Sequence, residues 1–244
     1  VLGVLSWVLL PGRRSFALAA RTINEAQTIT WTWTAYTRYH SKDGKRTWLQ
    51  HELATFAYRH PGLYRHTYYD DDGTVAWVTI VDARSGKTLS LDMKNKKIHP
   101  RGPGSQSGHN PQGPFGWVAE VLKTKPLELA GQRTVDGRTV NVIRYHNEKM
   151  PDKQRNSVDL WIDAETKQLV GFSEPGADVF DPETMADRDN PAEDDWSTTE
   201  PGLGSVTRDI VFNAKLDPEL FSLTPPEGFE LVDPPPPLVT EKDL

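Results

Sequence analysis

The sequence predicts an α+β domain built on one antiparallel β-sheet, and three observations predict it. Several segments alternate in their side chains with a period of two and are rich in β-branched and aromatic residues, which is typical of strands. Short turns join successive segments of this kind, as in an antiparallel meander. Two other segments repeat their apolar residues with helical spacing. The chain has 244 residues, 36% hydrophobic and 25% charged, which is enough for a domain with a real core.

The first predicted element is an amphipathic helix in the segment RRSFALAARTINEAQ. Phe16, Ala19, Ala20, Ile23 and Ala26 fall on one helical face, and polar residues fall on the other. We therefore expect this helix to bury one face against the rest of the domain.

The first strand follows directly in TITWTWTAYTRYH. Ile29, Trp31 and Trp33 share one face, and threonines occupy the other. A turn after Asp43 leads to a returning strand in RTWLQHELATFAY, and more strands are predicted in LYRHTYY, TVAWVTIVDA and TLSLDM. One antiparallel sheet is expected to contain Ile29–Tyr39, Val75–Val81, Val158–Ile162 and Val206–Phe212.

The second half of the chain adds one short helix and further strands. The segment FGWVAEVLK places Trp117, Val118, Val121 and Leu122 on one side, which predicts a helix over Phe115–Lys123 that packs on the sheet. Strands are predicted in LELAGQRTV, RTVNVIRYH and SVTRDIVFNAKL, and a hairpin in SVDLWIDAETKQLVGFS.

Turns and loops divide these elements. The turns Asp82–Leu89 and Asp163–Leu169 share an Asp followed three residues later by Ser or Thr, which is ordinary hairpin chemistry. His99–Pro114 is rich in Gly, Pro and Ser, and Asp181–Gly204 is acidic and poor in apolar residues. We expect these two segments to be the least ordered interior parts of the chain.

The C-terminal segment is expected to end the sheet. After LDPELF, whose Leu220 and Phe221 should pack back on the core, Pro225 and Pro226 have no N–H to donate to a further ladder. The folded domain is therefore expected to end near Val232. The following proline run is a stiff extended spacer, so residues 233–244 form a Pro-rich linker to a further segment.

The distribution of charge excludes one class of partner. Residues 176–200 contain nine acids and one base, a charge of -8, which leaves +2 for the rest of a chain whose formal net charge is -6. No basic face is clustered anywhere, so a nucleic-acid partner is not expected. The absence of cysteine excludes a disulfide framework and thiolate chemistry.

The chain opens with the apolar run VLGVLSWVLL, whose ten residues are too few to cross a bilayer, which needs about 20. Three interpretations stay open: the end of a membrane anchor, which we favour, the core of a signal peptide, or a buried helix. The segment FALAA looks like a signal-peptide cleavage site, but Arg13 and Arg14 stand between it and the apolar run. Residues 1–14 are therefore predicted to be the end of an anchor or a linker.

Three segments together resemble one known family. The strand TITWTWTAYTRYHS after an amphipathic helix, the hairpin DLWIDAETKQLVGFS and the ending LDPELFSLTPPEGFEL resemble the lipoprotein-carrier-like superfamily. That group includes the periplasmic lipoprotein carrier LolA and the N-terminal domain of the sigma-E regulator RseB. The resemblance covers about Ser15 to Val232 and implies one domain over residues 15–232. It implies a curved antiparallel sheet, an incomplete barrel, with helices plugging the concave face.

The resemblance also implies a location and a kind of partner. An apolar run before such a domain looks like envelope sensors and anti-sigma-type regulators, so we expect an extracytoplasmic, periplasmic domain anchored in the inner membrane through its N-terminal segment. The expected partners are a hydrophobic ligand or lipoprotein, or an envelope or regulatory protein. A soluble periplasmic carrier of lipid or lipoprotein is the alternative.

Metal and catalytic chemistry is weakly indicated. His40, His51, His60 and His66 fall in one predicted meander, but their spacing matches no short metal motif. The acidic segment DRDNPAEDDW offers oxygen ligands for calcium, yet it has a proline at the fifth position of an EF-hand loop and no glycine at the sixth. There is no G-x-S-x-G, P-loop or H-E-x-x-H motif. We therefore expect no cofactor and no enzymatic activity, with a metal-dependent hydrolase as the alternative of another class.

A curved sheet that helices close imperfectly leaves an apolar cavity suited to an acyl chain. Alternation alone cannot decide which face of each strand is concave. The cavity wall is predicted to consist of Trp31, Trp33, Val75, Trp77, Leu89, Leu91, Val140, Val142, Leu160 and Ile162, with Trp117 and Val121 on the helical plug.

Overall fold

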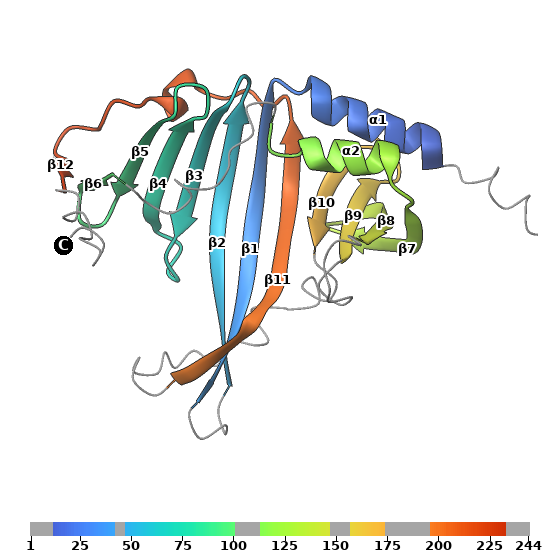
Figure 1. Cartoon of the computed structure of the whole chain (residues 1–244), viewed down its shortest axis with the longest axis horizontal. Helices are drawn as coiled ribbons and strands as arrows, with labels where there is room; N and C mark the ends of the chain where they lie inside the picture. The colour runs from blue at the N-terminus through green and yellow to red at the C-terminus, as the bar shows by residue number, and fades with distance from the viewer. Residues whose placement is uncertain (1–11, 42–46, 101–112, 147–156, 174–195, 233–244) are drawn as a thin grey trace, which may run out of the picture.

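The computed structural model describes residues 12–41, 47–100, 113–146, 157–173 and 196–232 (Figure 1). The predicted N-terminal anchor and the Pro-rich linker lie outside the described residues, except for the first residues of the helix at 12–14. Most of the segment His99–Pro114 also lies outside them, as do residues 181–195 of the acidic segment.

The described chain forms one large antiparallel sheet with two α-helices and one short 3₁₀ helix. The elements in chain order are α1 Gly12–Glu25, β1 Thr28–Ser41, β2 Thr47–Arg59, β3 Leu63–Tyr69, β4 Val75–Asp82, β5 Lys87–Asp92, β6 Lys97–His99, α2 Gly116–Thr124, β7 Glu128–Val135, β8 Arg138–His146, β9 Ser157–Asp163, β10 Leu169–Ser173, β11 Trp196–Phe212, η4 Pro218–Phe221 and β12 Glu230–Leu231.

The sheet has 12 strands in the order β12-β6-β5-β4-β3-β2-β1-β11-β10-β9-β8-β7. Neighbouring strands are antiparallel except β12 and β6. The four predicted strand ranges all belong to this sheet, which confirms that prediction. The sheet is open and not closed into a barrel, so the predicted α+β class with a curved, incomplete barrel is confirmed.

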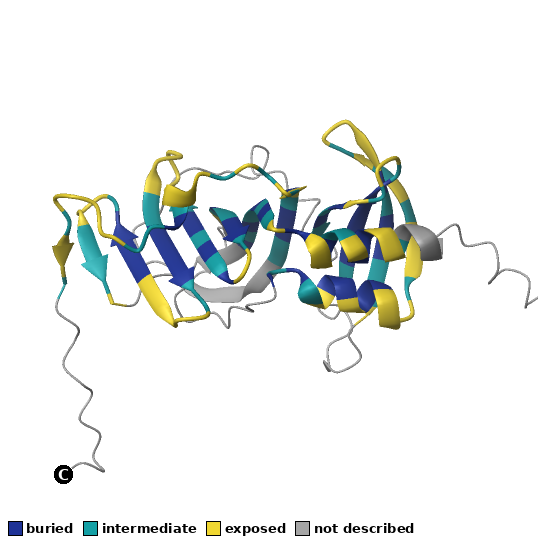
Figure 2. Ribbon diagram, turned by 90° about the horizontal axis from the view of Figure 1, so that it is seen from above, coloured by how far each residue is buried: buried dark blue, intermediate teal, exposed yellow. Residues whose placement is uncertain are grey.

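The two helices lie on one face of the sheet and contact each other. In Figure 1 they cover the side of the sheet from β11 to β7, and neither described α-helix covers β2 to β6. Helix α1 buries Ala19, Ala20, Ile23 and the following Ala26, as its periodicity predicted. Figure 2 shows the buried faces of both helices turned inward and their exposed faces turned outward.

The largest apolar core lies between the helices and this face. It includes Ile29 and Trp31 of β1, Val118 of α2 and Leu160 and Ile162 of β9. We call this helix-bearing face the concave face, and the opposite face the convex face. Two smaller clusters pack on the convex face, one around Trp161 and one around Val78 and Leu91.

The two Asp turns are built as the sequence predicted. The Asp163 carboxylate accepts hydrogen bonds from the backbone N–H of Thr166 at 2.7 Å and of Glu165 at 2.9 Å. The Thr166 bond is the main reason why the pKa of Asp163 lies below its ordinary value. In the other turn, the Ser85 hydroxyl donates a hydrogen bond to the Asp82 carboxylate, and this bond is the main reason why the pKa of Asp82 is lowered.

The ends of two elements differ from the prediction. Strand β11 begins at Trp196, inside the segment predicted to be a loop, and pairs with the far end of β1 at Ser41. The prediction that no strand follows Pro226 was also wrong. The chain turns at Gly228, whose φ of +82° is in the left-handed region, and β12 then pairs parallel with β6. A proline stops a ladder only where its own N–H is needed, and β12 begins after both prolines.

Candidate functional site

Aromatic side chains form a continuous surface on the concave face of β1, β2, β3 and β4. Residues paired across neighbouring strands share a face, so the register defines this surface. One row of paired residues runs from Trp31 through Phe56 to His66. The rings of Trp31 and Phe56 are stacked with centroids 5.0 Å apart and planes 4° apart, and the Phe56 and His66 centroids are 4.7 Å apart.

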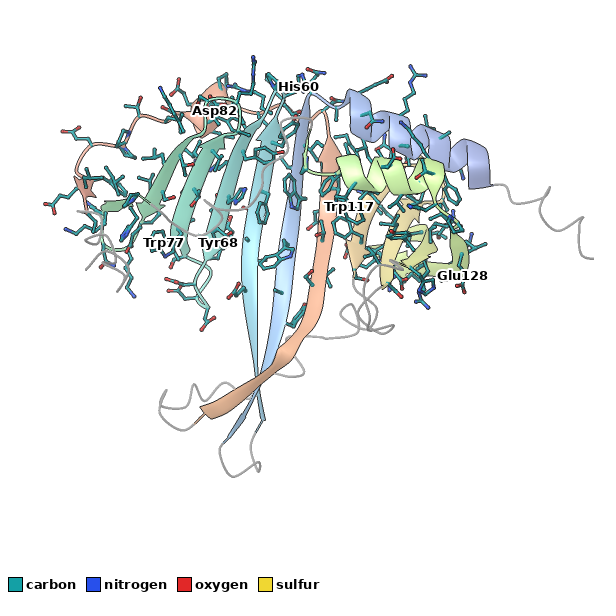
Figure 3. The ribbon with its side chains drawn as sticks, in the orientation of Figure 1. His60, Tyr68, Trp77, Asp82, Trp117 and Glu128 are labelled. Atoms are coloured by element: carbon teal, nitrogen blue, oxygen red, sulfur yellow. The ribbon has the colours of Figure 1, made fainter. Side chains whose placement is uncertain are left out.

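The next row lies further from α1 and is more exposed. It pairs Trp33 with Ala54, Ala54 with Tyr68 and Tyr68 with Trp77. The small side chain of Ala54 separates two large rings in this row. Trp33, Tyr68 and Trp77 are half-buried, and Trp33 meets Phe56 edge-on at 6.5 Å. In Figure 3 the labelled Tyr68 and Trp77 lie on the part of the sheet away from Trp117 of α2.

The same face becomes polar toward β5 and β6. The row of His66 continues to Thr79, Ser90 and His99. Thr79 and Ser90 are fully buried, and their hydroxyls are 3.3 Å apart. The row of Trp77 continues to Asp92. Buried polar groups are costly unless they are hydrogen-bonded, and the Thr79 and Ser90 hydroxyls satisfy each other. This end of the surface is therefore polar, whereas the part on β1 to β3 is aromatic.

Two groups near this polar end have defined electrostatics. Asp92 accepts hydrogen bonds from the backbone N–H of Asn95 at 2.9 Å and from its side-chain amide at 2.8 Å. Burial acts to raise the pKa of Asp92, but these bonds outweigh it and hold the pKa below its ordinary value. The His99 ring contacts Trp77 with centroids 4.8 Å apart.

The phenols on the aromatic surface are neutral at physiological pH. Burial raises the pKa of Tyr64 far above its ordinary value, with a smaller contribution from Tyr58. Burial is also the main reason why the pKa of Tyr68 is raised, and Glu52 adds to it. The aromatic part of the surface therefore carries no phenolate charge.

The structure brings together seven of the twelve predicted cavity residues. On the strands of the concave face lie Trp31, Trp33, Trp77, Leu160 and Ile162, and on α2 lie Trp117 and Val121. Trp117 is 41% exposed at the margin of α2, and the centroids of its ring and the Phe172 ring are 5.5 Å apart. Whether these residues hold a ligand stays a prediction.

The other five predicted residues lie on the convex face. Val75, at the start of β4 and 37% exposed, pairs with Tyr69, because a β-bulge separates it from the pair of Tyr68 and Trp77. Leu89 and Leu91 pair with Ile80 and Val78. The concave residue Trp77 pairs with Asp92 instead, so the two leucines point to the opposite face. Val140 and Val142 belong to the convex cluster around Trp161. A shift of one residue in pairing moves a strand's apolar set to the other face, and the sequence does not fix that register.

Sequence reasoning missed most of the aromatic surface. Phe56, Tyr64, His66 and Tyr68 were not among the predicted cavity residues, although they contribute the central rings. The signal was present, because LYRHTYY places an aromatic ring at every second position.

The described residues contain no candidate metal site and no membrane-spanning helix. In the part of the chain that the structure describes, no group of three or more His, Asp or Glu side chains could hold a metal ion. His66 is buried among aromatic rings, and the side chains of His40 and His51 lie outside the described residues, as does the predicted calcium segment. No helix within the described ranges is long and apolar enough to span a membrane.

Comparison with known proteins finds likeness in structure but not in sequence. No family model matches the chain. No curated protein matches it either. Similar solved structures include the lipoprotein LppX of Mycobacterium tuberculosis, 11% identical with a TM-score of 0.44, where the match covers 84% of this chain and 96% of LppX.

Two further solved structures are similar to this chain at low identity. A LolA superfamily protein from Nitrosomonas europaea is 9% identical with a TM-score of 0.29, and the match covers 86% of this chain and 97% of that one. MucB in complex with MucA(peri) is 14% identical with a TM-score of 0.40, and the match covers 87% of this chain and 60% of MucB. These matches are likenesses to solved structures alone, and the resemblance to the lipoprotein-carrier-like superfamily stays a prediction from the sequence. At such identities and TM-scores, we base no argument about ligands or partners on them.

Proposed function

We propose that this chain is a non-enzymatic, extracytoplasmic binding domain whose concave aromatic surface holds an apolar ligand, such as an acyl chain or the lipid of a lipoprotein. The observation that supports this proposal is the set of half-buried rings of Trp33, Phe56, Tyr68 and Trp77 on β1 to β4, of which neither described α-helix covers β2 to β4. Rings of this kind offer a large apolar area and stay uncharged.

The polar end of the same face supports an amphiphile as the ligand. Apolar carbons would contact the aromatic rows, and an uncharged polar head would lie near Asp92 and His99, whereas a carboxylate head would extend into solvent away from the ionised Asp92. The extracytoplasmic location, the single domain over residues 15–232 and the use of binding in regulation by a membrane-anchored protein are parts of this proposal. They rest on the sequence resemblance and on the apolar run at residues 1–10.

The first test is titration with saturated fatty acids of increasing length, below their micelle concentrations, followed by tryptophan fluorescence. Each CH₂ that leaves water contributes about 0.8 kcal/mol, so affinity should rise roughly fourfold per carbon until the surface is filled. Dodecanoate is expected to bind with a dissociation constant on the order of 10 µM, after ordering costs are subtracted.

Two variants and one control locate the site. Trp33→Ala and Trp77→Ala should each weaken dodecanoate binding at least about tenfold, because each ring contributes apolar contact area. Leu129→Ala, on edge strand β7 and 52% exposed, should leave the affinity unchanged. Non-saturable signals, or equal weakening by the control, would refute an acyl-binding concave surface.

A further inference from the structure

A cavity of about 440 Å³ lies on the convex face, between the sheet and the C-terminal segment. Thr30 and Thr32 of β1 contribute to its floor, together with threonines of β2 and β3. Leu216 and Leu220, before and within η4, form the wall that faces them. Thr30 and Thr32 alternate along β1 with Trp31, so their side chains point away from the concave aromatic surface. The volume of the cavity falls in the range of roughly 300–1,000 Å³ that is typical of small-molecule binding sites.

The cavity contains one partly buried cation, Arg65 of β3. Its Nε donates a hydrogen bond to the Thr67 hydroxyl at 3.3 Å, and its Nη1 donates to the Leu220 carbonyl at 3.2 Å. A guanidinium has five N–H donors, so these two bonds leave three for a ligand or water. Among the described residues, no carboxylate forms an ion pair with Arg65.

This guanidinium is fixed in place before any ligand arrives. The carbonyl of Leu220 and the hydroxyl of Thr67 hold it from two sides. Burial lowers the pKa of Arg65, yet arginine stays protonated in proteins. A partly desolvated, preorganised cation that forms no ion pair with a described carboxylate is stabilised by an oxyanion, which can accept two parallel hydrogen bonds from it.

The rest of the lining restricts the oxyanion. Asp209 is exposed in solvent, has a φ of +55° and also lines the cavity. Together with Arg65 it makes the formal charge of the lining zero, so a second negative charge on a ligand is opposed. Leu216, Leu220 and Val211 offer apolar contact for a short branched group.

We propose that this convex cavity binds a small monocarboxylate with a branched apolar body, its acid group on Arg65 and its carbon atoms against Leu216 and Leu220. The site is independent of the acyl-binding surface proposed above, because it lies on the other face of the sheet.

The test follows backbone amide signals of the whole chain by NMR during titration with isovalerate, isovaleramide and inorganic phosphate. Isovalerate should cause saturable shifts of the amide signals around Arg65 and Leu220. Because it has only about seven non-hydrogen atoms, we expect a dissociation constant on the order of 1 mM. Isovaleramide should bind at least about tenfold more weakly, because it cannot form charge-assisted hydrogen bonds. Phosphate should also bind at least about tenfold more weakly than isovalerate. Its dianionic form carries a second negative charge, which the Asp209 carboxylate repels.

Variants assign the effect to this cavity. Arg65→Gln should remove isovalerate binding, and Trp33→Ala on the concave face should leave it unchanged. Because Arg65→Gln also removes the bond to Leu220, Val211→Phe provides a second route: this residue is 51% exposed, and a larger side chain should obstruct the cavity without disturbing the core. The proposal is overturned if isovaleramide or phosphate binds as tightly as isovalerate, if no saturable shift occurs, or if Val211→Phe binds normally.

Discussion

Replacing Gly171 with alanine is expected to destabilise the protein by about 3 kcal/mol or to prevent folding. A Cβ at this position would stand 2.6 Å from the Thr207 carbonyl oxygen and 2.6 Å from the Trp161 ring. Neither neighbour can move freely. Thr207 is part of β11, and the Arg133 guanidinium lies 4.1 Å from the centroid of the Trp161 ring.

The matched control is Gly73→Ala. Gly73 has a φ of +80°, and an added Cβ there would meet nothing within 4 Å. This substitution should cost only about 1 kcal/mol of backbone strain. Chemical unfolding of both variants measures the difference. If both variants lose the same free energy of unfolding, the close packing of Gly171 against Trp161 and Thr207 does not hold β10 in place.

Leu160→Ala is the second variant with a large expected effect, a loss of about 3 kcal/mol in the free energy of unfolding. Leu160 is fully buried in the core beneath the helices and pairs with Ile143 and Phe172 on its two sides. Truncation removes apolar contacts and leaves a cavity that a rigid sheet cannot close.

Leu129→Ala is the matched leucine control for this loss. Its exposed position on β7 should limit the change to about 0.5 kcal/mol. Urea unfolding curves of the two variants and the unaltered chain provide the comparison. A loss at Leu160 as small as that at Leu129 would mean that the helices do not pack on β9 as the structure describes.

The period of each segment predicted the strands and helices well, because alternation and helical spacing are local properties. Trp31 and Trp33 share one face of β1, as alternation along a single strand predicts, and the buried face of α1 followed from the positions of Ala19 and Ile23. The face of a strand depends on pairing with distant residues. Leu91 therefore went to the wrong face, since its partner is Val78 and not Trp77.

The candidate site was predicted less completely than the fold. Its central rings, Phe56 and Tyr68, come from strands whose alternation was visible, but only the cross-strand register shows that they contact each other. The convex cavity could not be anticipated at all. It exists because Leu220 returns to β3 from 155 positions away in the sequence, where its carbonyl accepts from Arg65.

The central claim is that an acyl chain binds the concave aromatic surface, and fluorine NMR of the chain labelled with fluorinated tryptophan tests it most directly. Trp33 and Trp77 lie on that surface, whereas Trp161 is buried on the convex face, so one residue type reports on both sides. Tryptophan-to-phenylalanine variants assign the signals. On addition of dodecanoate, the signals of Trp33 and Trp77 should shift saturably and together, and that of Trp161 should stay in place. A saturable shift of Trp161 without shifts of Trp33 and Trp77 would contradict the account.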